Sequence, residues 1–182
     1  MKRQRITLDD SSIVTYIVRQ LKVVKGKKAL QKITYFVESA GVPLSYVFRW
    51  WLYGPYSKEL DIDISYLIAE DVFDYQVSSD SSFAILKTKN IPLEEEIVQD
   101  EEIKTTINET MKKLKEITDD FNPLKLELAA SIHFIVSNAS NEEDKSIEAV
   151  VEKIKTAKGN KFTKKEIREM YRRLIDSGLM RG

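Results

Sequence analysis

Residues 46–60 read YVFRWWLYGPYSKEL, and their changes of character predict a strand, a turn and the start of a helix. Tyr46–Tyr53 consists almost entirely of aromatic and β-favouring residues, which predicts a short strand. Gly54-Pro55 predicts a turn, because Gly permits close backbone approach and Pro presets the torsion of a first helical position. Ser57 is suited to cap a third helix, in which Leu60 and the apolar residues after it recur at helical spacing.

Two helices are predicted before this strand. Asp9 or Asp10 can cap the first, whose apolar residues recur at helical spacing until Gly26, a natural stop in the left-handed conformation. The second contains apolar residues from Leu30 to Val37 and ends at the Gly-Val-Pro sequence that follows. Only about three residues join the two helices, which is typical of a helical hairpin or of the first half of a helix-turn-helix.

The chain after the third helix predicts a β-hairpin and then helices. Two β-favouring runs, residues 73–78 and 83–88, are joined by a polar segment. Residues 93–121 predict one long amphipathic helix with a break near Asp100, and its narrow apolar stripe resembles a coiled-coil seam. The predicted helices after it are residues 124–137, opened by Asn122-Pro123, residues 141–157, and a last one opened by the capping box Thr163–Glu166.

This order of elements predicts a mainly α (α+β) fold. Three helices with a short strand among them, followed by a two-stranded wing, are typical of a winged helix, a variant of the helix-turn-helix. We therefore predict a winged-helix-like domain at residues 1–90, a connecting helix at 91–121 and a C-terminal helical domain at 122–182. The seam within residues 93–121 predicts either a link between the two domains or a homodimer.

Composition excludes several kinds of chemistry. The chain has 182 residues, no cysteine and one histidine, so its own residues form no disulfide, thiolate metal site or cysteine nucleophile. The histidine, His133, lies between Ile132 and Phe134, which indicates a hydrogen-bonded core residue and not a metal ligand. The phosphate-binding glycine loops and the nucleophile-elbow motif do not occur. We therefore expect no catalytic residue, no metal and no cofactor.

Hydrophobicity predicts a cytoplasmic protein without a membrane partner. The apolar runs fall short of the roughly 18–20 residues that cross a bilayer. No secretory apolar segment follows the basic start of the chain.

Zero formal net charge hides a strong segregation of charge. Residues 1–32 and residues 153–182 each carry a net charge of +7, whereas residues 33–152 carry −14. A phosphate backbone senses the local field within about one Debye length, some 8–10 Å, so overall neutrality does not exclude a polyanionic partner. The alternative is that the basic ends fold back onto the acidic centre, within one chain or across a dimer.

Two motifs resemble a known family. Residues 28–36, KALQKITYF, and residues 48–60, FRWWLYGPYSKEL, resemble the core of YwgA-like prokaryotic proteins. They are more distantly similar to the Panacea domain of antitoxins, which shares an L-Q-K-hydrophobic-x-Y-F helix and a Y-G-P turn. Residues 126–135 and Ser177-Gly178-Leu179 also resemble the C-terminal part of YwgA-like proteins, but more weakly. The resemblance implies a winged-helix-like fold and a non-catalytic role, and the chain departs from the Panacea pattern at Tyr56-Ser57.

The third helix has the wrong charge for entering the major groove of DNA. A recognition helix lies between phosphates and needs cations, whereas this helix carries carboxylates almost throughout. Its carboxylates and those directly after it are Glu59, Asp61, Asp63, Glu70 and Asp71, against Lys58. Nucleic-acid contact is therefore predicted elsewhere, at Lys25, Lys27, Lys28, Lys32, Lys164, Lys165, Arg168 and Arg172.

Two functions follow from these patterns. The first is a nucleic-acid-binding regulator that uses the two basic ends. The second is an antitoxin-like or adaptor module that holds a basic protein partner through an acidic helix and aromatic residues. Its predicted contact residues are Trp51, Tyr53, Tyr56, Glu59 and Asp63. The Trp50-Trp51 pair also permits base stacking, although the pattern favours packing of a hydrophobic strand on both faces.

Overall fold

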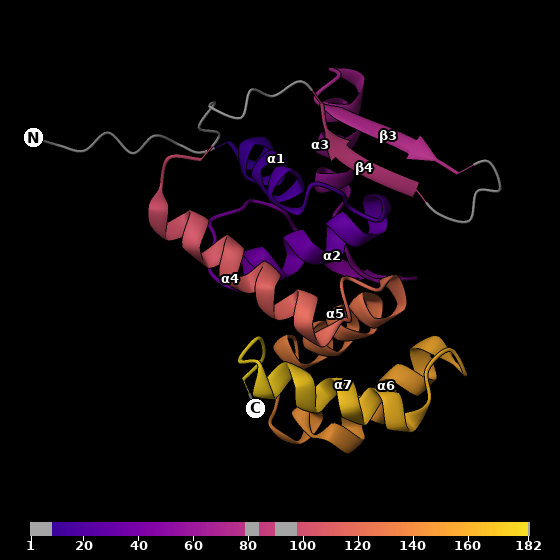
Figure 1. Ribbon diagram of the computed structural model, residues 1–182. Coiled ribbons are helices and arrows are strands. Elements are labelled where there is room, and N and C mark those ends of the chain that lie inside the picture. Colours follow the sequence, from indigo (N-terminus) through magenta and orange to yellow (C-terminus); the bar gives the residue numbers. More distant parts are fainter. Residues whose placement is uncertain (1–8, 79–83, 90–97, 182) are drawn as a thin grey trace, which may run out of the picture.

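The structure is a computed structural model, and it describes residues 9–78, 84–89 and 98–181 (Figure 1). These residues are mainly helical and contain two small antiparallel sheets, which confirms the predicted α+β class. The helices are α1 (Asp10–Leu21), α2 (Gly26–Ser39), α3 (Lys58–Ala69), α4 (Glu101–Ile117), α5 (Pro123–Ser137), the short 3₁₀ helix η1 (Glu143–Lys145), α6 (Ile147–Lys158) and α7 (Lys164–Asp176). The strands are β1 (Arg49–Trp51), β2 (Gly54–Tyr56), β3 (Phe73–Val77) and β4 (Ala84–Thr88).

The first connection differs from the prediction. Helix α1 ends at Leu21, and Gly26 is the first residue of α2 instead of the stop of α1. Lys27 and Lys28 therefore belong to the first turn of α2 and not to a connecting turn. Between the two helices Val24 forms an isolated antiparallel bridge with Leu86 of β4.

The strand predicted at Tyr46–Tyr53 is shorter than expected and is half of a tight hairpin. β1 pairs with β2 and places Trp51 opposite Gly54, so the residues predicted to be a turn lie in a strand. Gly54 has a φ of 88°, and a Cβ atom there would lie 2.7 Å from the Ser131 Oγ of α5. Glycine is thus required both by its backbone conformation and by close packing. The predicted second hairpin is confirmed as β3 and β4.

Helix α4 is shorter than the predicted helix at residues 93–121. The Asp100 carboxylate accepts hydrogen bonds from the backbone N–H groups of the first turn, so α4 begins directly after the position of the predicted break. Residues 93–97 of the predicted helix lie outside the described part of the chain. At the other end, residues 119–121 all have positive φ, so the helix stops at Ile117. The apolar stripe of α4 packs against α2 and α7. The described part of this stripe, for which the sequence predicts either a link between two domains or a homodimer, is therefore buried within one chain.

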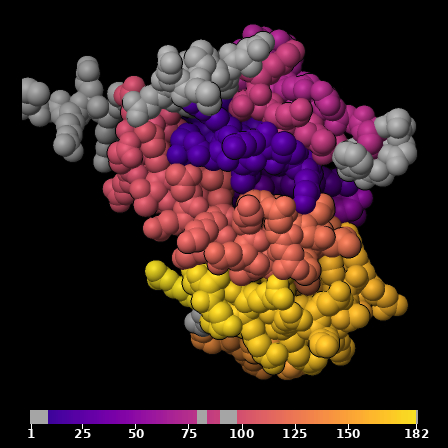
Figure 2. Space-filling model, in the orientation of Figure 1, coloured from indigo at the N-terminus to yellow at the C-terminus, as the bar shows by residue number. Residues whose placement is uncertain are grey.

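Helix α5 lies at the centre of the molecule. It packs against α2 and β2 on one side and against α6 and α7 on the other (Figure 1). Its residues from Leu126 to His133 are all buried, because neighbours surround the helix. In the space-filling view, the magenta β3 and β4 lie at the top above the indigo N-terminal helices, and the salmon and orange α4 and α5 separate these from α6 and α7 at the bottom (Figure 2). One hydrophobic cluster extends from Ile13 to Met180.

Candidate binding groove

A large groove lies where several parts of the chain meet. It has a volume of about 970 Å³ and a mainly apolar lining. Its walls are formed by the first turn of α2, the β1–β2 hairpin, Asp61 of α3, the β3–β4 sheet, the start of α5 and the segment before α7. We call it the lysine–aromatic groove. Its lysines are Lys25, Lys27, Lys28, Lys32 and Lys161, and its aromatic residues are Trp51, Tyr53, Tyr56 and Tyr75.

Three of these lysines occupy the start of α2 and have no carboxylate partner among the described residues. The Lys25 Nζ donates to the Asp120 carbonyl oxygen at 3.0 Å. The Lys27 Nζ donates to the Ser65 Oγ at 3.0 Å, and the Lys28 Nζ lies 3.5 Å from the centre of the Tyr53 ring. The first turn of α2 holds no acidic residue, and the side chain of its N-cap residue accepts no hydrogen bond from the backbone N–H groups of the helix. Positive charge at this helix end is therefore uncompensated by nearby ion pairs.

The aromatic residues of the groove come mainly from the β1–β2 hairpin. Trp51 is 60% exposed and Tyr53 is 41% exposed. The Trp51 and Tyr56 rings lie 6.3 Å apart with an interplanar angle of 31°. Their exposure follows from the short hairpin, whose two-residue loop Leu52-Tyr53 carries side chains beyond the core. Large flat apolar surfaces are thus presented beside the lysines of α2.

Gln31 and Lys32 are structural residues at the floor of the groove. The Gln31 amide donates to the Ser57 carbonyl oxygen at 2.8 Å and accepts from the Ser57 N–H at 2.9 Å. The buried Lys32 Nζ donates to the Pro55 carbonyl oxygen at 2.6 Å. Burial lowers the pKa of Lys32 to about 8, against an opposing effect of Glu127. These bonds hold β2 and the start of α3 on α2, so Lys32 does not present its charge at the surface.

A buried carboxylate links the groove to the C-terminal helices. Glu127 of α5 is 7% exposed, and its oxygens lie 3.0 Å from the Lys158 Nζ and 2.7 Å from the Lys161 Nζ. Lys158 also donates to the Leu52 carbonyl oxygen at 2.6 Å, which fixes the loop of the β1–β2 hairpin. Burial lowers the pKa of Lys158 even though Glu127 acts in the opposite direction. Since one carboxylate serves two ammonium groups, this part of the groove keeps a net positive charge.

The predicted basic face of the last helix lies elsewhere and is partly neutralised by α6. Lys164 pairs with Glu152 at 2.7 Å, and the Arg168 guanidinium makes two hydrogen bonds to Glu148, at 3.0 and 2.8 Å. The other predicted cations of this face, Lys165 and Arg172, are exposed. The structure does not bring Lys164, Lys165, Arg168 or Arg172 into the groove. The alternative that the basic C-terminal end meets acidic residues of the same chain therefore holds for part of α7.

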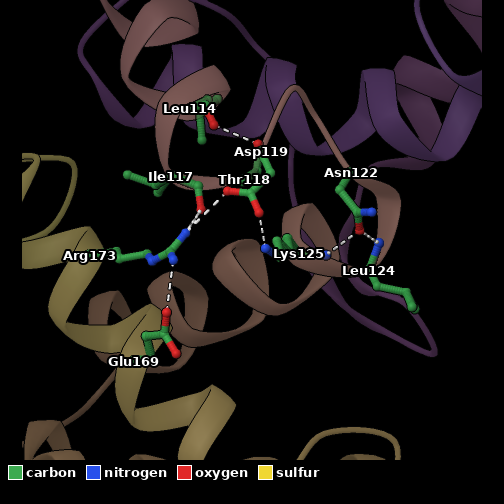
Figure 3. Close-up of polar contacts among 9 residues, drawn as sticks. All are labelled: Leu114, Ile117, Thr118, Asp119, Asn122, Leu124, Lys125, Glu169 and Arg173. Atoms are coloured by element: carbon green, nitrogen blue, oxygen red, sulfur yellow. Dashed lines mark hydrogen bonds and ion pairs between the residues drawn. The ribbon is translucent and has the colours of Figure 1, made fainter.

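Arg173 of α7 also makes its polar contacts with other residues of the same chain (Figure 3). Its guanidinium donates to the Ile117 carbonyl oxygen at 3.1 Å and pairs with Asp119 at 3.3 Å and with Glu169 at 2.8 Å. Asp119 also pairs with Lys125, and the two cations lower the pKa of its carboxyl group. These contacts anchor the turn between α4 and α5 on α7 (Figure 3).

The structure separates the residues of the protein-binding alternative. Trp51, Tyr53 and Tyr56 lie in the lysine–aromatic groove. On α3, Glu59 accepts a hydrogen bond from the Ser57 hydroxyl at 2.8 Å, and Asp63 accepts one from the Tyr46 hydroxyl at 2.8 Å. The sequence reasoning missed two exposed apolar residues of α3, Ile62 and Tyr66, which are 57% and 59% exposed. Neither residue shares the helical spacing of the apolar residues by which α3 faces the core. That spacing was the signal from which their exposure could have been predicted.

His133 is a hydrogen-bonded core residue, as predicted. Its Nδ1 lies 2.7 Å from the Tyr35 hydroxyl, and the two rings meet edge to face. Burial lowers the pKa of His133 to about 4, against the raising effect of a backbone hydrogen bond with Leu179. Among the described residues no group of three or more His, Cys, Asp or Glu side chains is arranged to hold a metal ion.

Comparison with models of known protein families found no match, and a search of curated proteins found none either. Within residues 9–78, 84–89 and 98–181, no helix is both long and apolar enough to cross a membrane.

Proposed function

We propose that the protein is a non-catalytic nucleic-acid-binding module whose lysine–aromatic groove contacts phosphates. The observation that carries the proposal is the convergence of Lys25, Lys27 and Lys28 on one groove without carboxylate partners in the described chain. Lys161 approaches the same groove from the C-terminal end. Because these ammonium groups have no carboxylate partner, they break no ion pair within the described chain when they bind a phosphate. Binding also releases counterions from the nucleic acid.

A winged-helix-like arrangement of the N-terminal elements supports the proposal. The order α1, Val24 bridge, α2, β1, β2, α3, β3 and β4 resembles that of a winged helix in which a short strand after the first helix pairs with the wing, with the β1–β2 hairpin added between α2 and α3. The mode of contact differs from the usual one, because α3 carries carboxylates where a recognition helix meets phosphates. The proposed contact surface is instead the start of α2 together with the adjacent face of the β3–β4 sheet.

A salt-graded binding measurement tests this function. The groove variant Lys25→Gln, Lys27→Gln, Lys28→Gln is compared with a charge-matched control outside the groove, Lys164→Gln, Lys165→Gln, Arg172→Gln. We expect the groove variant to bind labelled DNA at least about 10-fold more weakly and to lower the salt slope by about 2 to 3, and the control to bind as the wild type does. Equal losses in the two variants, or wild-type binding that is unchanged between about 50 and 200 mM salt, contradict the proposal.

A second function is supported by the exposed face of α3. Ile62 and Tyr66 are four residues apart and lie on one side of the helix, next to the acidic residues Glu59 and Glu70. An apolar centre with an acidic rim suits a basic protein partner, as in the antitoxin-like or adaptor alternative. If this function is correct, an affinity purification from the host recovers a stoichiometric protein with the wild type and loses it with Ile62→Ser. Recovery that is unchanged in that variant excludes α3 as the contact.

A further inference from the structure

We infer that the lysine–aromatic groove binds an unpaired nucleic-acid strand, with bases stacked on Trp51 and Tyr53 and phosphates at the lysines of α2. This inference rests on the proposed function and specifies its ligand. It follows from three features of the described residues: exposed aromatic rings, a mainly apolar lining with cations beside it, and the unsuitable charge of α3 for a duplex.

The aromatic rings provide a stacking surface that the fold holds in place. Trp51 and Tyr53 are exposed although burial of each ring would be favourable, and Tyr56 lies beside Trp51. The hydrogen bond from the Lys158 Nζ to the Leu52 carbonyl oxygen holds the loop that carries Tyr53 in place. A fixed platform loses little conformational freedom when a base stacks on it. Exposed aromatic rings beside cations are the usual elements of single-strand binding surfaces.

The composition of the groove indicates a ligand with both a flat apolar part and a negative charge. A polyphosphate without bases would leave the mainly apolar lining unused. A neutral apolar ligand would leave the lysines of α2 unused. A nucleobase joined to a phosphate satisfies both parts of the groove. Free nucleotides and nucleic-acid strands share this chemistry, and the length of the ligand distinguishes them.

A duplex fits the groove less well than an unpaired strand. In a duplex the base faces are stacked on one another, so a protein meets phosphates and base edges and the aromatic rings have no base to stack on. The helix that would enter the major groove carries Glu59, Asp61 and Asp63, whose carboxylates repel phosphates. Asp61 also lines the groove, so an unpaired strand meets one carboxylate of that helix, whereas a duplex would lie along all three.

The contact between Lys28 and Tyr53 suggests how a base and a phosphate are bound together. In the free protein the Lys28 ammonium lies 3.5 Å from the centre of the Tyr53 ring, and the Lys161 ammonium lies 5.1 Å from it. A base that stacks on the Tyr53 ring takes the place of Lys28. The displaced ammonium, on a flexible stem, is then free to pair with the adjoining phosphate. Stacking and charge pairing are therefore coupled at this position.

Fluorescence anisotropy with four labelled probes tests the inference. The probes are oligo(dT) of about 12 nucleotides, an abasic phosphodiester of the same length, a duplex of the same length, and labelled dTMP. We expect oligo(dT) to bind about 10-fold or more tightly than each of the others at the same salt concentration. Trp51→Ala weakens oligo(dT) binding about 5- to 10-fold and leaves abasic binding unchanged, whereas Trp51→Phe keeps most of the affinity.

The control variant is Leu52→Ala, which removes an exposed apolar residue next to Trp51 that does not line the groove. It should bind all four probes as the wild type does. Equal binding of oligo(dT) and the abasic probe, or tighter binding of the duplex, overturns the stacking inference and leaves the proposed function intact. Tighter binding of dTMP than of oligo(dT) overturns the assignment to a strand. If none of the probes binds, the proposed function fails as well.

Discussion

The buried His133 is expected to make the protein sensitive to acid. The imidazole is 7% exposed, and its Nδ1 is within hydrogen-bond distance of the Tyr35 hydroxyl, which favours the neutral ring. Burial lowers the pKa of His133 from 6.5 to about 4 in the folded protein. Between these two values the unfolded chain binds a proton that the folded chain does not. His133 therefore contributes stability above pH 6.5, and this stability is lost as the pH falls towards 4.

The size of this effect follows from the difference between the two pKa values. A difference of one pKa unit corresponds to about 1.4 kcal/mol, so a pKa of about 4 in place of 6.5 corresponds to about 3 kcal/mol of stability lost between pH 7 and pH 4. The variant His133→Gln has no titrating group at this position. It should be less stable than the wild type at pH 7, because it loses the packing and hydrogen bond of the ring. Its stability should fall by about 3 kcal/mol less than that of the wild type on going to pH 4.

Two measurements check this reasoning. Urea denaturation of both proteins at several pH values gives the difference in free energy of unfolding, and other titrating groups cancel because both proteins share them. The chain has one histidine, so NMR of the untagged protein reports the His133 pKa from a single imidazole signal. Stabilities that fall in parallel for the two proteins, or a His133 signal that titrates near 6.5, refute the reasoning.

Three further predictions concern stability. Gly54→Ala should lower the free energy of unfolding in urea by at least about 2 kcal/mol, because φ is 88° and the new Cβ would lie 2.7 Å from the Ser131 Oγ; a loss below about 0.5 kcal/mol would mean that the hairpin adapts. Burial, and to a smaller extent Asp10, raises the pKa of Glu38 to about 7. The folded chain therefore holds a proton that the unfolded chain releases, and the stability that Glu38 contributes is lost as the pH rises from 4.5 through 7, which is the opposite pH dependence to that of His133. Glu38→Gln should remove this loss and raise the melting temperature at pH 8 but not at pH 4, with an effect of about 1 kcal/mol because the side chain is partly exposed; equal shifts at the two pH values would contradict it. Thr163→Ala removes the cap of α7 and should cost about 1 kcal/mol in the same urea assay, whereas Thr163→Ser should cost less than half of that.

Local signals in the sequence predicted most of the secondary structure. Ser57, Asn122 and Thr163 were predicted as helix caps, and each side chain accepts the expected backbone hydrogen bonds. The β3–β4 hairpin was also predicted from residue types alone. Such signals succeed because a cap or a helical period depends on residues within a few positions of each other. The α1–α2 connection and the β1–β2 hairpin were predicted less well, since Gly26 and Gly54 each permit more than one local conformation.

The amino-acid sequence alone determined the helical class, the absence of thiol chemistry and the charge of each segment. Tertiary packing decided which of those charges remain available. It joined Lys161 to the lysines of α2, paired Arg168 with Glu148, and placed the Tyr35 hydroxyl on His133, 98 positions away. No local pattern encodes such pairs, because their energies depend on distance and burial between segments that the whole core brings together.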